Sequence, residues 1–353
     1  MIAPLLGITS TSARMGLAAL TTLLITLLWG PWWIRQLYSW KVGQPIRKSE
    51  APLLGELHKE KEKTPTMGGL LILSALLISL LLWMDLGSPY ALILLITTLV
   101  LGGIGALDDL LKLKSKSSRG LSSKLKFTMQ VGFSLALAAY LLLGELRGVT
   151  AQFYLPCLPG PLFTVTGFFT LLWALWIAFI VTGSSNAVNL TDGLDGLASG
   201  LVAFTAAGLS VVAFLSARGF PSLPPIEGAG EIAIFLAALV GACVGFLWYN
   251  GHPAQVFMGD TGSLALGGLL GVSALLLRQE VLFGIMAAVI VAEALSVILQ
   301  VSYFRATGGR RIFRCSPLHH HFEYKGMPES RVTLRFWIVG LFTTLLGMVL
   351  VLC

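Results

Sequence analysis

The sequence predicts an all-α, polytopic membrane protein with about ten transmembrane helices, and two observations lead to this prediction. Of the 353 residues, 56% are hydrophobic and only 12% are charged, whereas soluble domains carry about 25% charged residues. The apolar residues also fall into runs of about 17 to 22, the length of a helix that spans a bilayer. In lipid a helix satisfies its own backbone hydrogen bonds, so we expect these runs to be helical.

Ten such runs can be marked along the chain. They cover residues 15–34, 67–84, 89–107, 125–143, 165–185, 194–215, 231–248, 261–277, 281–302 and 332–352. The first run lacks a small-x-small cleavage site, so we expect a retained span and not a removed signal peptide. Internal repeats and low-complexity tracts are absent from the sequence. Residues 1–353 are therefore interpreted as one membrane domain.

The orientation of the helices follows from the basic residues between the runs. Segments 35–66, 108–126 and 303–331, which fall on one side of the membrane, hold 19 Lys and Arg residues. The opposite side holds Arg14, Arg147, Arg218 and Arg278. The positive-inside rule places the richer side in the cytoplasm and, with an even number of spans, both termini in the periplasm.

Five aspartates gather at the predicted cytoplasmic edge. Asp108 and Asp109 end the third run, Asp192 and Asp195 open the sixth, and Asp260 opens the eighth. Helix capping is an alternative role for an Asp at a helix N-terminus. It does not explain a carboxylate pair at a helix C-terminus, which faces the negative end of the dipole. If the three runs converge, their carboxylates form an oxygen-rich cluster of the kind that Mg²⁺ binds.

Cations and polar loops surround these aspartates. Lys112, Lys124 and Lys126 follow the acidic pair, and cations beside carboxylates are typical of phosphoryl transfer. A positive-inside loop is the alternative explanation for these lysines. Segment 186–196 concentrates Asn, Thr, Asp and Gly between two runs, and its glycines would let a ligand approach the backbone. In a second polar loop, Phe257 is either an interface anchor or a base-stacking platform.

Two further features concern the end of the chain. Three consecutive histidines at 319–321 cannot all point at one metal ion, so contacts to phosphate or proton handling suit them better. Glu293 lies within the ninth run and shares a helical stripe with Ser296 and Gln300. An intramembrane carboxylate is a functional candidate that usually faces the bundle interior. A transporter would show one too, but the other ionisable groups crowd one membrane edge instead of forming a path across.

Composition also excludes some classes of function. The net charge of +7 is what basic cytoplasmic loops produce, and no basic helix interleaved with aromatics indicates binding of nucleic acid. The four cysteines have no C-x-x-C spacing, so a disulfide framework is not expected.

Several of these motifs together resemble a known family. They are the stretches 64–69 (TPTMGG), 108–109 (DD), 189–196 (NLTDGLDG), 250–260 (NGHPAQVFMGD), 293–300 (EALSVILQ) and 317–323 (PLHHHFE). In this order, from about residue 35 to the C-terminus, the sequence resembles the phospho-N-acetylmuramoyl-pentapeptide-transferase (MraY) family. Related polyprenyl-phosphate N-acetylhexosamine-1-phosphate transferases share the acidic motifs. The triple His followed by Phe-Glu resembles the muramoyl-pentapeptide branch.

The resemblance implies a reaction at the bacterial inner membrane that belongs to peptidoglycan synthesis. Phospho-MurNAc-pentapeptide would pass from UDP-MurNAc-pentapeptide to undecaprenyl phosphate, releasing UMP and forming lipid I. Asp260 would bind Mg²⁺, while Asp108 and Asp109 would activate or position the lipid phosphate. The residues implied to line the uridine pocket are Asn189, Asp192, Gly193, Leu194, Asp195 and Phe257. Those implied to hold phosphates and sugar are Lys63, Lys112, Lys124, Lys126, Asn250, His319, His320 and His321.

The resemblance leaves three choices open. Asp108 could be a nucleophile that forms a covalent intermediate, or a base for direct attack by the lipid phosphate. A sibling transferase that uses UDP-N-acetylglucosamine is the rival enzyme. The oligomeric state is open between a monomer and a homodimer.

Overall fold

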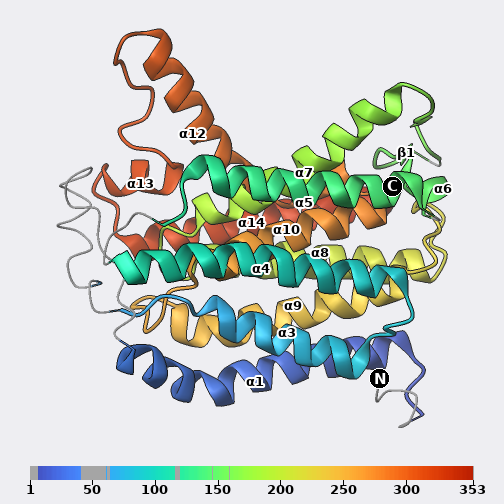
Figure 1. Ribbon diagram of the computed structural model, residues 1–353, viewed down its shortest axis with the longest axis horizontal. Helices are drawn as coiled ribbons and strands as arrows, with labels where there is room; N and C mark the ends of the chain where they lie inside the picture. Colours follow the sequence, from blue (N-terminus) through green and yellow to red (C-terminus); the bar gives the residue numbers. More distant parts are fainter. Residues whose placement is uncertain are drawn as a thin grey trace.

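The structure, a computed structural model, is an almost wholly helical bundle (Figure 1). It describes residues 7–40, 61, 64–115, 120–144, 146–158 and 160–352. The long helices are α1 (Thr11–Ser39), α3 (Gly69–Trp83), α4 (Pro89–Ser115), α5 (Ser123–Leu143), α7 (Phe169–Thr191), α8 (Leu197–Ala217), α9 (Ala229–Asn250), α10 (Gly259–Leu277), α12 (Ala288–Ala306) and α14 (Glu329–Leu352). The short elements are α6 (Arg147–Thr150), α11 (Glu280–Met286), α13 (Leu318–Glu323) and the antiparallel strands β1 (Gln152–Phe153) and β2 (Phe163–Thr164).

The predicted all-α, polytopic architecture is confirmed. Within the described ranges, nine helices are long and apolar enough to cross a membrane, and each predicted run contains a helix. Helix α3 has 15 residues and is about 22 Å long, shorter than a hydrocarbon core of about 30 Å. The beginning of α1 and the end of α14 lie at the same end of the bundle (Figure 1).

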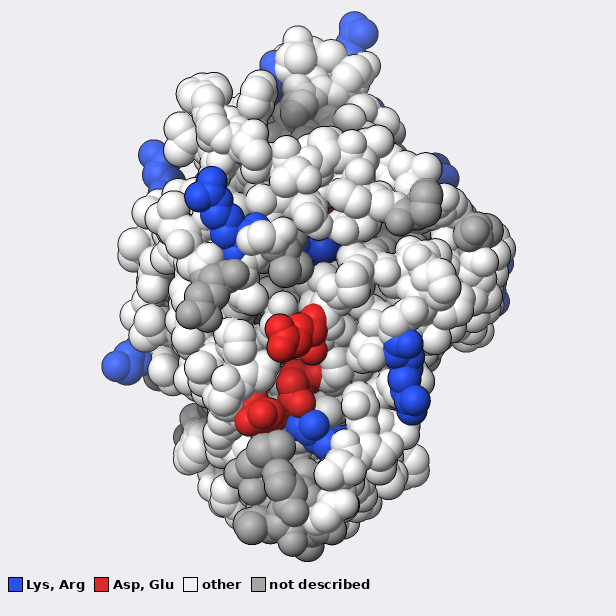
Figure 2. Space-filling view, turned by 90° about the vertical axis from the view of Figure 1, so that its right-hand side faces the viewer, with Lys and Arg blue, Asp and Glu red and all other residues white. Residues whose placement is uncertain are grey.

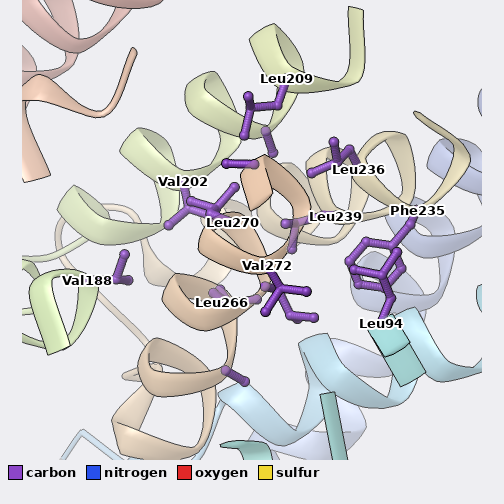
Figure 3. Close-up of a cluster of buried hydrophobic side chains, with 14 of the residues drawn as sticks. Leu94, Val188, Val202, Leu209, Phe235, Leu236, Leu239, Leu266, Leu270 and Val272 are labelled. Atoms are coloured by element: carbon purple, nitrogen blue, oxygen red, sulfur yellow. The ribbon is translucent and has the colours of Figure 1, made fainter. Parts of the chain in front are cut away.

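Helix α10 forms the centre of the core. Every residue from Thr261 to Leu277 is buried, as expected for a helix that is apolar on all sides. Figure 3 shows Leu266, Leu270 and Val272 of α10 surrounded by side chains from neighbouring helices, among them Leu94 and Phe235. The first turn of α10 is consequently held in place by the packing of the rest of the helix.

Glycines let two other helices approach the first turn of α10 closely. A Cβ atom at Gly105 of α4 would lie 2.2 Å from the carbonyl oxygen of Asp260, and one at Gly69 would lie 2.2 Å from the amide nitrogen of Gly262. Small residues at helix crossings allow such backbone contact within membranes. Helices α3, α4 and α10 therefore meet at one point, beside Asp260.

Two expected helix boundaries are wrong, and both concern aspartates. Helix α4 continues to Ser115, so Asp108 and Asp109 lie about two turns inside it and not at its end. The helix continues because Lys112 pairs with both carboxylates one turn later, at 2.6 and 3.7 Å, and such pairs support a helix. Asp192 is the residue after the end of α7, and α8 begins only at Leu197.

The ninth predicted run, 281–302, is broken and does not form one helix. Helix α11 ends at Met286, Ala287 has φ −90° and ψ 20°, and α12 then turns away from the bundle (Figure 1). The hydroxyl of Thr343 donates to the Met286 carbonyl oxygen at 3.2 Å, which supplies a partner where the helical ladder is interrupted. The expectation that the Glu293 stripe faces inward is confirmed, since Glu293 is fully buried.

The two ends of the bundle differ in charge. Figure 2 shows the end at the right of Figure 1, which is mostly uncharged apart from one compact acidic patch and scattered basic side chains. At this end Arg14 pairs with Glu231 at 2.9 Å and donates to the Trp83 carbonyl oxygen at 2.7 Å. These contacts tie α1, α3 and α9 together. The aspartates predicted to carry chemistry lie at the opposite end.

We predict that Gly105→Ala destabilises the protein, because the added methyl group would push α4 away from α10. Overpacking of this kind typically costs about 1 to 3 kcal/mol. The matched control is Gly103→Ala on the exposed face of the same helix, where nothing lies within 4 Å of the new Cβ. Thermal unfolding in detergent should show a lower Tm for Gly105→Ala only. Equal Tm values for the two variants would contradict this description of the crossing.

Candidate active site

Asp109 of α4 caps the N-terminus of α10 from a different helix. Its carboxylate accepts hydrogen bonds from the backbone N–H groups of Asp260 (3.2 Å) and Thr261 (2.9 Å) and from the Thr261 hydroxyl (2.7 Å). The first N–H groups of a helix have no partner within that helix and favour a negative charge. Asp109 therefore fixes the turn of α10 that carries Asp260.

Asp108 is buried one residue earlier on α4. Its Oδ1 accepts a hydrogen bond from the Leu121 amide at 2.8 Å, and its Oδ2 lies 2.6 Å from Nζ of Lys112. A Cβ atom at Gly120 would lie 2.6 Å from Asp108 Oδ1. The chain can pass this close to the carboxylate because residue 120 is glycine.

Asp260 receives groups from two further helices. Its Oδ2 lies 2.8 Å from Nζ of Lys126 on α5 and 3.1 Å from Nζ of Lys112 on α4. The Asn189 side-chain amide on α7 donates to Asp260 Oδ1 at 2.9 Å and to the Ser263 hydroxyl at 2.8 Å. Helices α4, α5, α7 and α10 thus all contribute to one site, whereas the sequence pointed to the third, sixth and eighth runs.

The chemistry of these side chains suits a cation. Asp108, Asp109 and Asp260 each offer an oxygen atom, and the three oxygens lie within 4.8 Å of one another. Two ammonium groups, Lys112 and Lys126, face three carboxylates, so one negative charge is left over. Carboxylate oxygens are hard ligands, and this group of residues could hold a metal ion of the Mg²⁺ type.

The turn after α7 brings a further carboxylate to the cluster. Burial and the negative charges of Asp260, Asp109 and Asp195 raise the pKa of Asp192 to about 8. Among the residues that the structure describes, none hydrogen-bonds to the Asp192 side chain. Next to it, a Cβ atom at Gly193 would lie 2.2 Å from Nε2 of His319. Only glycine leaves room for this ring, so the turn and the histidine segment are in direct contact.

Asp195 is the centre of a second cluster. Its Oδ1 lies 2.6 Å from Nζ of Lys61, and its Oδ2 accepts from the Ala254 amide (3.1 Å) beside His252 Nδ1 (3.0 Å). Glu329 of α14 also pairs with Lys61 at 2.5 Å and accepts from the Asp195 amide at 2.7 Å. The Asp195 carboxylate is thus occupied by protein groups. It joins the turn after α7 to Lys61, His252 and Ala254 without offering a free negative charge.

Phe257 lies half-buried at the rim of this second cluster. Nζ of Lys61 lies 5.9 Å from the centre of the Phe257 ring, within the range of a cation–π contact. The Phe257 amide donates to the Pro65 carbonyl oxygen, and its own carbonyl oxygen accepts from the Gly68 amide, each at 2.8 Å. The backbone of Phe257 is therefore held on both sides of the residue.

Asn250 holds the loop that carries Phe257. Its side-chain oxygen accepts from the Ser199 hydroxyl at 2.8 Å, and its amide donates to the Val256 carbonyl oxygen at 3.0 Å. The residue is buried, so its contacts are with the protein. Leu194 is buried as well.

The three histidines engage three different partners, as three consecutive positions must. His319 Nδ1 lies 3.2 Å from the Glu293 carboxylate, His320 Nδ1 lies 2.7 Å from the Glu323 carboxylate, and His321 Nδ1 accepts from the Arg314 amide at 3.0 Å. His319 is buried, and its backbone amide donates to Glu293 at 3.1 Å. Glu293 on α12 therefore holds the backbone of the residue whose ring touches Gly193.

One of the expected lysines, Lys124, does not join the cluster. Lys124 is exposed, and among the described residues it has no ion pair. Lys63 lies outside the described residues. Lys61, three residues before Thr64, pairs with Asp195 and Glu329.

Comparison with known proteins identifies the family of this chain. The model of the family described as Glycosyl transferase family 4 matches residues 91–278, and phospho-N-acetylmuramoyl-pentapeptide-transferase signature 1 matches residues 61–73. A phospho-N-acetylmuramoyl-pentapeptide-transferase of Protochlamydia amoebophila (strain UWE25) is 49% identical over 380 residues, which cover 95% of this chain and 92% of that protein. The chain belongs to the phospho-N-acetylmuramoyl-pentapeptide-transferase family.

In this member of the family, both matched segments contain residues of the candidate site. Residues 91–278 include all three clustered carboxylates, and the signature at 61–73 includes Lys61. Sequence reasoning missed Lys61, His252, Thr261 and Glu329. The sequence signal that could have pointed to Lys61 is its place at the start of the signature at residues 61–73. Glu329 resembled an ordinary acidic residue in the first turn of a helix, and only the fold brings it to Lys61.

We predict that Lys126→Met lowers transferase turnover about 100-fold, the usual effect of removing one charge-stabilising group. The ammonium lies 2.8 Å from Asp260, and its loss would leave the carboxylates with less compensation. Lys114→Met is the matched control, because Lys114 is exposed in the last turn of α4. Steady-state rates of the two variants would test this. Similar rates for both would remove Lys126 from the site.

Proposed function

We propose that this chain transfers phospho-N-acetylmuramoyl-pentapeptide from UDP-MurNAc-pentapeptide to undecaprenyl phosphate, giving lipid I and UMP. The relative's name supports this transfer. The observation that carries the proposal is the cluster of Asp108, Asp109 and Asp260 with Lys112 and Lys126. Carboxylates that hold a cation, together with ammonium groups, are what phosphoryl transfer requires.

The proposal places the site on the cytoplasmic face of the bacterial inner membrane. The three basic segments of the sequence, whose described parts lie at the site's end of the bundle, carry 19 of the Lys and Arg residues, and basic loops stay in the cytoplasm. A charged UDP-sugar would reach the site from the cytoplasm. A lipid phosphate would lie at the depth of the head groups, where the long helices end. One membrane edge therefore serves both substrates.

In the proposed reaction, an oxygen of undecaprenyl phosphate bonds to the phosphorus attached to the sugar. The bond from that phosphorus to the oxygen bridging to UMP breaks, and its electron pair leaves with UMP. Lys112 and Lys126 offset the charge on the phosphates. Asp260, with Asp108 and Asp109 beside it, would hold Mg²⁺, which supplies Lewis-acid charge neutralisation on the diphosphate.

The hydrogen bonds of Asp108 and Asp109 support different roles for the two residues. All described bonds of Asp109 go to the first turn of α10, so we assign it as a positioning residue. Asp108 keeps one oxygen facing Lys112, on the side that the cations occupy. We assign Asp108 as the carboxylate that meets the lipid phosphate.

The nucleoside is proposed to bind between Phe257 and the turn at 192–195. The ring of Phe257 offers a face for uracil, since stacking on an aromatic ring tolerates any base. Asn189, Asp192, Gly193 and Leu194 would line the opposite side. Lys61, which lies over Phe257 and pairs with Asp195, is added to the set proposed from the sequence. Asn250 would hold the loop that carries Phe257, and the histidines would pack against the turn at Gly193.

We predict that the purified protein releases UMP and forms lipid I when given UDP-MurNAc-pentapeptide, undecaprenyl phosphate and Mg²⁺. Asp260→Asn should lower this turnover at least about 100-fold, because an amide keeps the shape but loses the charge that a bound cation requires. Mass spectrometry of the lipid product and chromatography of UMP provide the two measurements.

Asp85→Asn is the control for the Asp260 substitution. Asp85 is exposed at the other end of the bundle, where its side chain accepts from the Gly87 amide at 3.0 Å, which an Asn oxygen can also do. Its turnover should match the wild type. UDP-N-acetylglucosamine serves as the alternative donor. Turnover with UDP-N-acetylglucosamine but not with UDP-MurNAc-pentapeptide would contradict the proposal. Full activity of Asp260→Asn would contradict it as well.

A further inference from the structure

We propose that a cavity beside the C-terminal end of α12 binds the head group of an anionic phospholipid from the surrounding membrane. The cavity has a volume of about 290 Å³ and lies between α12 and segment 311–316. Its lining includes Gln300, Val301, Phe304, Arg305, Arg311 and Ser316. Such a volume is close to the lower end of the range for small-molecule sites, about 300 to 1,000 Å³.

The charge around this cavity calls for an anion. Arg305 and Arg311 line it, and Arg310 and Arg314 lie beside them in the chain; all four are exposed. Within the described part of the chain, none of the four forms an ion pair with an acidic side chain. Arg311 and Arg314 donate to backbone carbonyl oxygens. Guanidinium groups bind phosphate through paired hydrogen bonds, so a phosphate between Arg305 and Arg311 would relieve their mutual repulsion.

The outer face of α12 provides a surface for lipid chains. Leu295, Ile298, Leu299, Val301 and Phe304 are exposed on this helix, and α12 stands away from the bundle (Figure 1). The exposed apolar residues reach Phe304, which adjoins Arg305. A phospholipid would match this arrangement, with its acyl chains along the apolar face of α12 and its head group in the cavity beside Arg305. Basic pockets at the cytoplasmic ends of transmembrane helices are typical sites for anionic lipids.

The lipid substrate also carries a phosphate, but the position of the cavity favours a structural lipid. None of the cavity-lining residues belongs to the cluster of Asp108, Asp109 and Asp260. Helix α12 packs on α7, α13 and α14, whereas the cluster lies where α4 meets α10. A phosphate held by Arg305 and Arg311 would thus be bound by residues other than Lys112 and Lys126, which the proposed reaction uses.

A lipid in this cavity would also steady the chain that leads to the histidines. The Gln300 side-chain oxygen accepts from the amides of Ile312 (3.1 Å) and Phe313 (2.9 Å), which holds segment 311–316 on α12. That segment continues into α13, where His319 meets Glu293. The bound head group would add a second link between Arg305 of α12 and Arg311 of the segment.

The test compares phospholipid binding to three forms of the full-length protein. They are the wild type, the double variant Arg305→Gln/Arg311→Gln, and the control Arg331→Gln/Arg335→Gln. The control removes the same two charges on the same side of the membrane, from exposed residues outside the cavity lining. Native mass spectrometry in detergent, titrated with phosphatidylglycerol and separately with phosphatidylcholine, gives the affinities directly and without reference to transferase activity.

We expect the Arg305→Gln/Arg311→Gln variant to lose about fivefold in phosphatidylglycerol affinity for each arginine, roughly 25-fold in total. The control should bind phosphatidylglycerol like the wild type, and phosphatidylcholine should bind all three forms alike. Equal losses in both double variants would indicate unspecific attraction and overturn the proposal. Unchanged phosphatidylglycerol binding with a raised KM for undecaprenyl phosphate would also overturn it, because the cavity would then belong to the substrate.

Discussion

The hydrogen bonds from the first turn of α10 to Asp109 are the constraint on which the rest of the site depends. A helix N-terminus within a membrane protein needs partners for its free N–H groups, and here a carboxylate from α4 provides them. Gly105, one turn earlier on α4, allows the two backbones to touch. This contact sets Asp260 beside Asp108. The same interaction that completes the fold therefore also brings together the carboxylates that could hold a cation.

The remaining charges follow from this arrangement. Three carboxylates brought together in a protected place repel one another, and Lys112 and Lys126 reduce but do not cancel their charge. This excess of negative charge favours a bound cation. The same carboxylates would then serve both the stability and the function of the protein. The second cluster, around Asp195, is balanced differently, because Lys61 lies between two carboxylates. It joins the loop before α3, the turn before α8 and the start of α14.

The fold class was predictable because lipid permits few backbone arrangements, and the apolar runs therefore identify the helices. The predicted helix boundaries were wrong where charged residues lie inside a helix, as in α4. An apolar run appears to end at its first charged residue, but the ion pairs of Lys112 support the continuation of α4 beyond that point. The break at Ala287 has no proline to mark it in the sequence. Convergence of Asp108, Asp109 and Asp260 was predictable from their common membrane edge. The pairs of Lys61 with Asp195 and Glu329 join residues 134 and 268 positions apart, and no local pattern records them.

The central claim is that Asp109 acts through the first turn of α10, and a double-mutant cycle tests it most directly. The cycle combines Asp109→Asn with Thr261→Val, which removes the hydroxyl that donates to Asp109, and it measures Mg²⁺-dependent turnover of all four forms. If both changes disturb one contact, the double variant should lose no more activity than the more damaged single variant. Effects that instead add in free energy within about 0.3 to 0.5 kcal/mol, as independent sites do, would contradict the account and place Asp109 in direct contact with substrate.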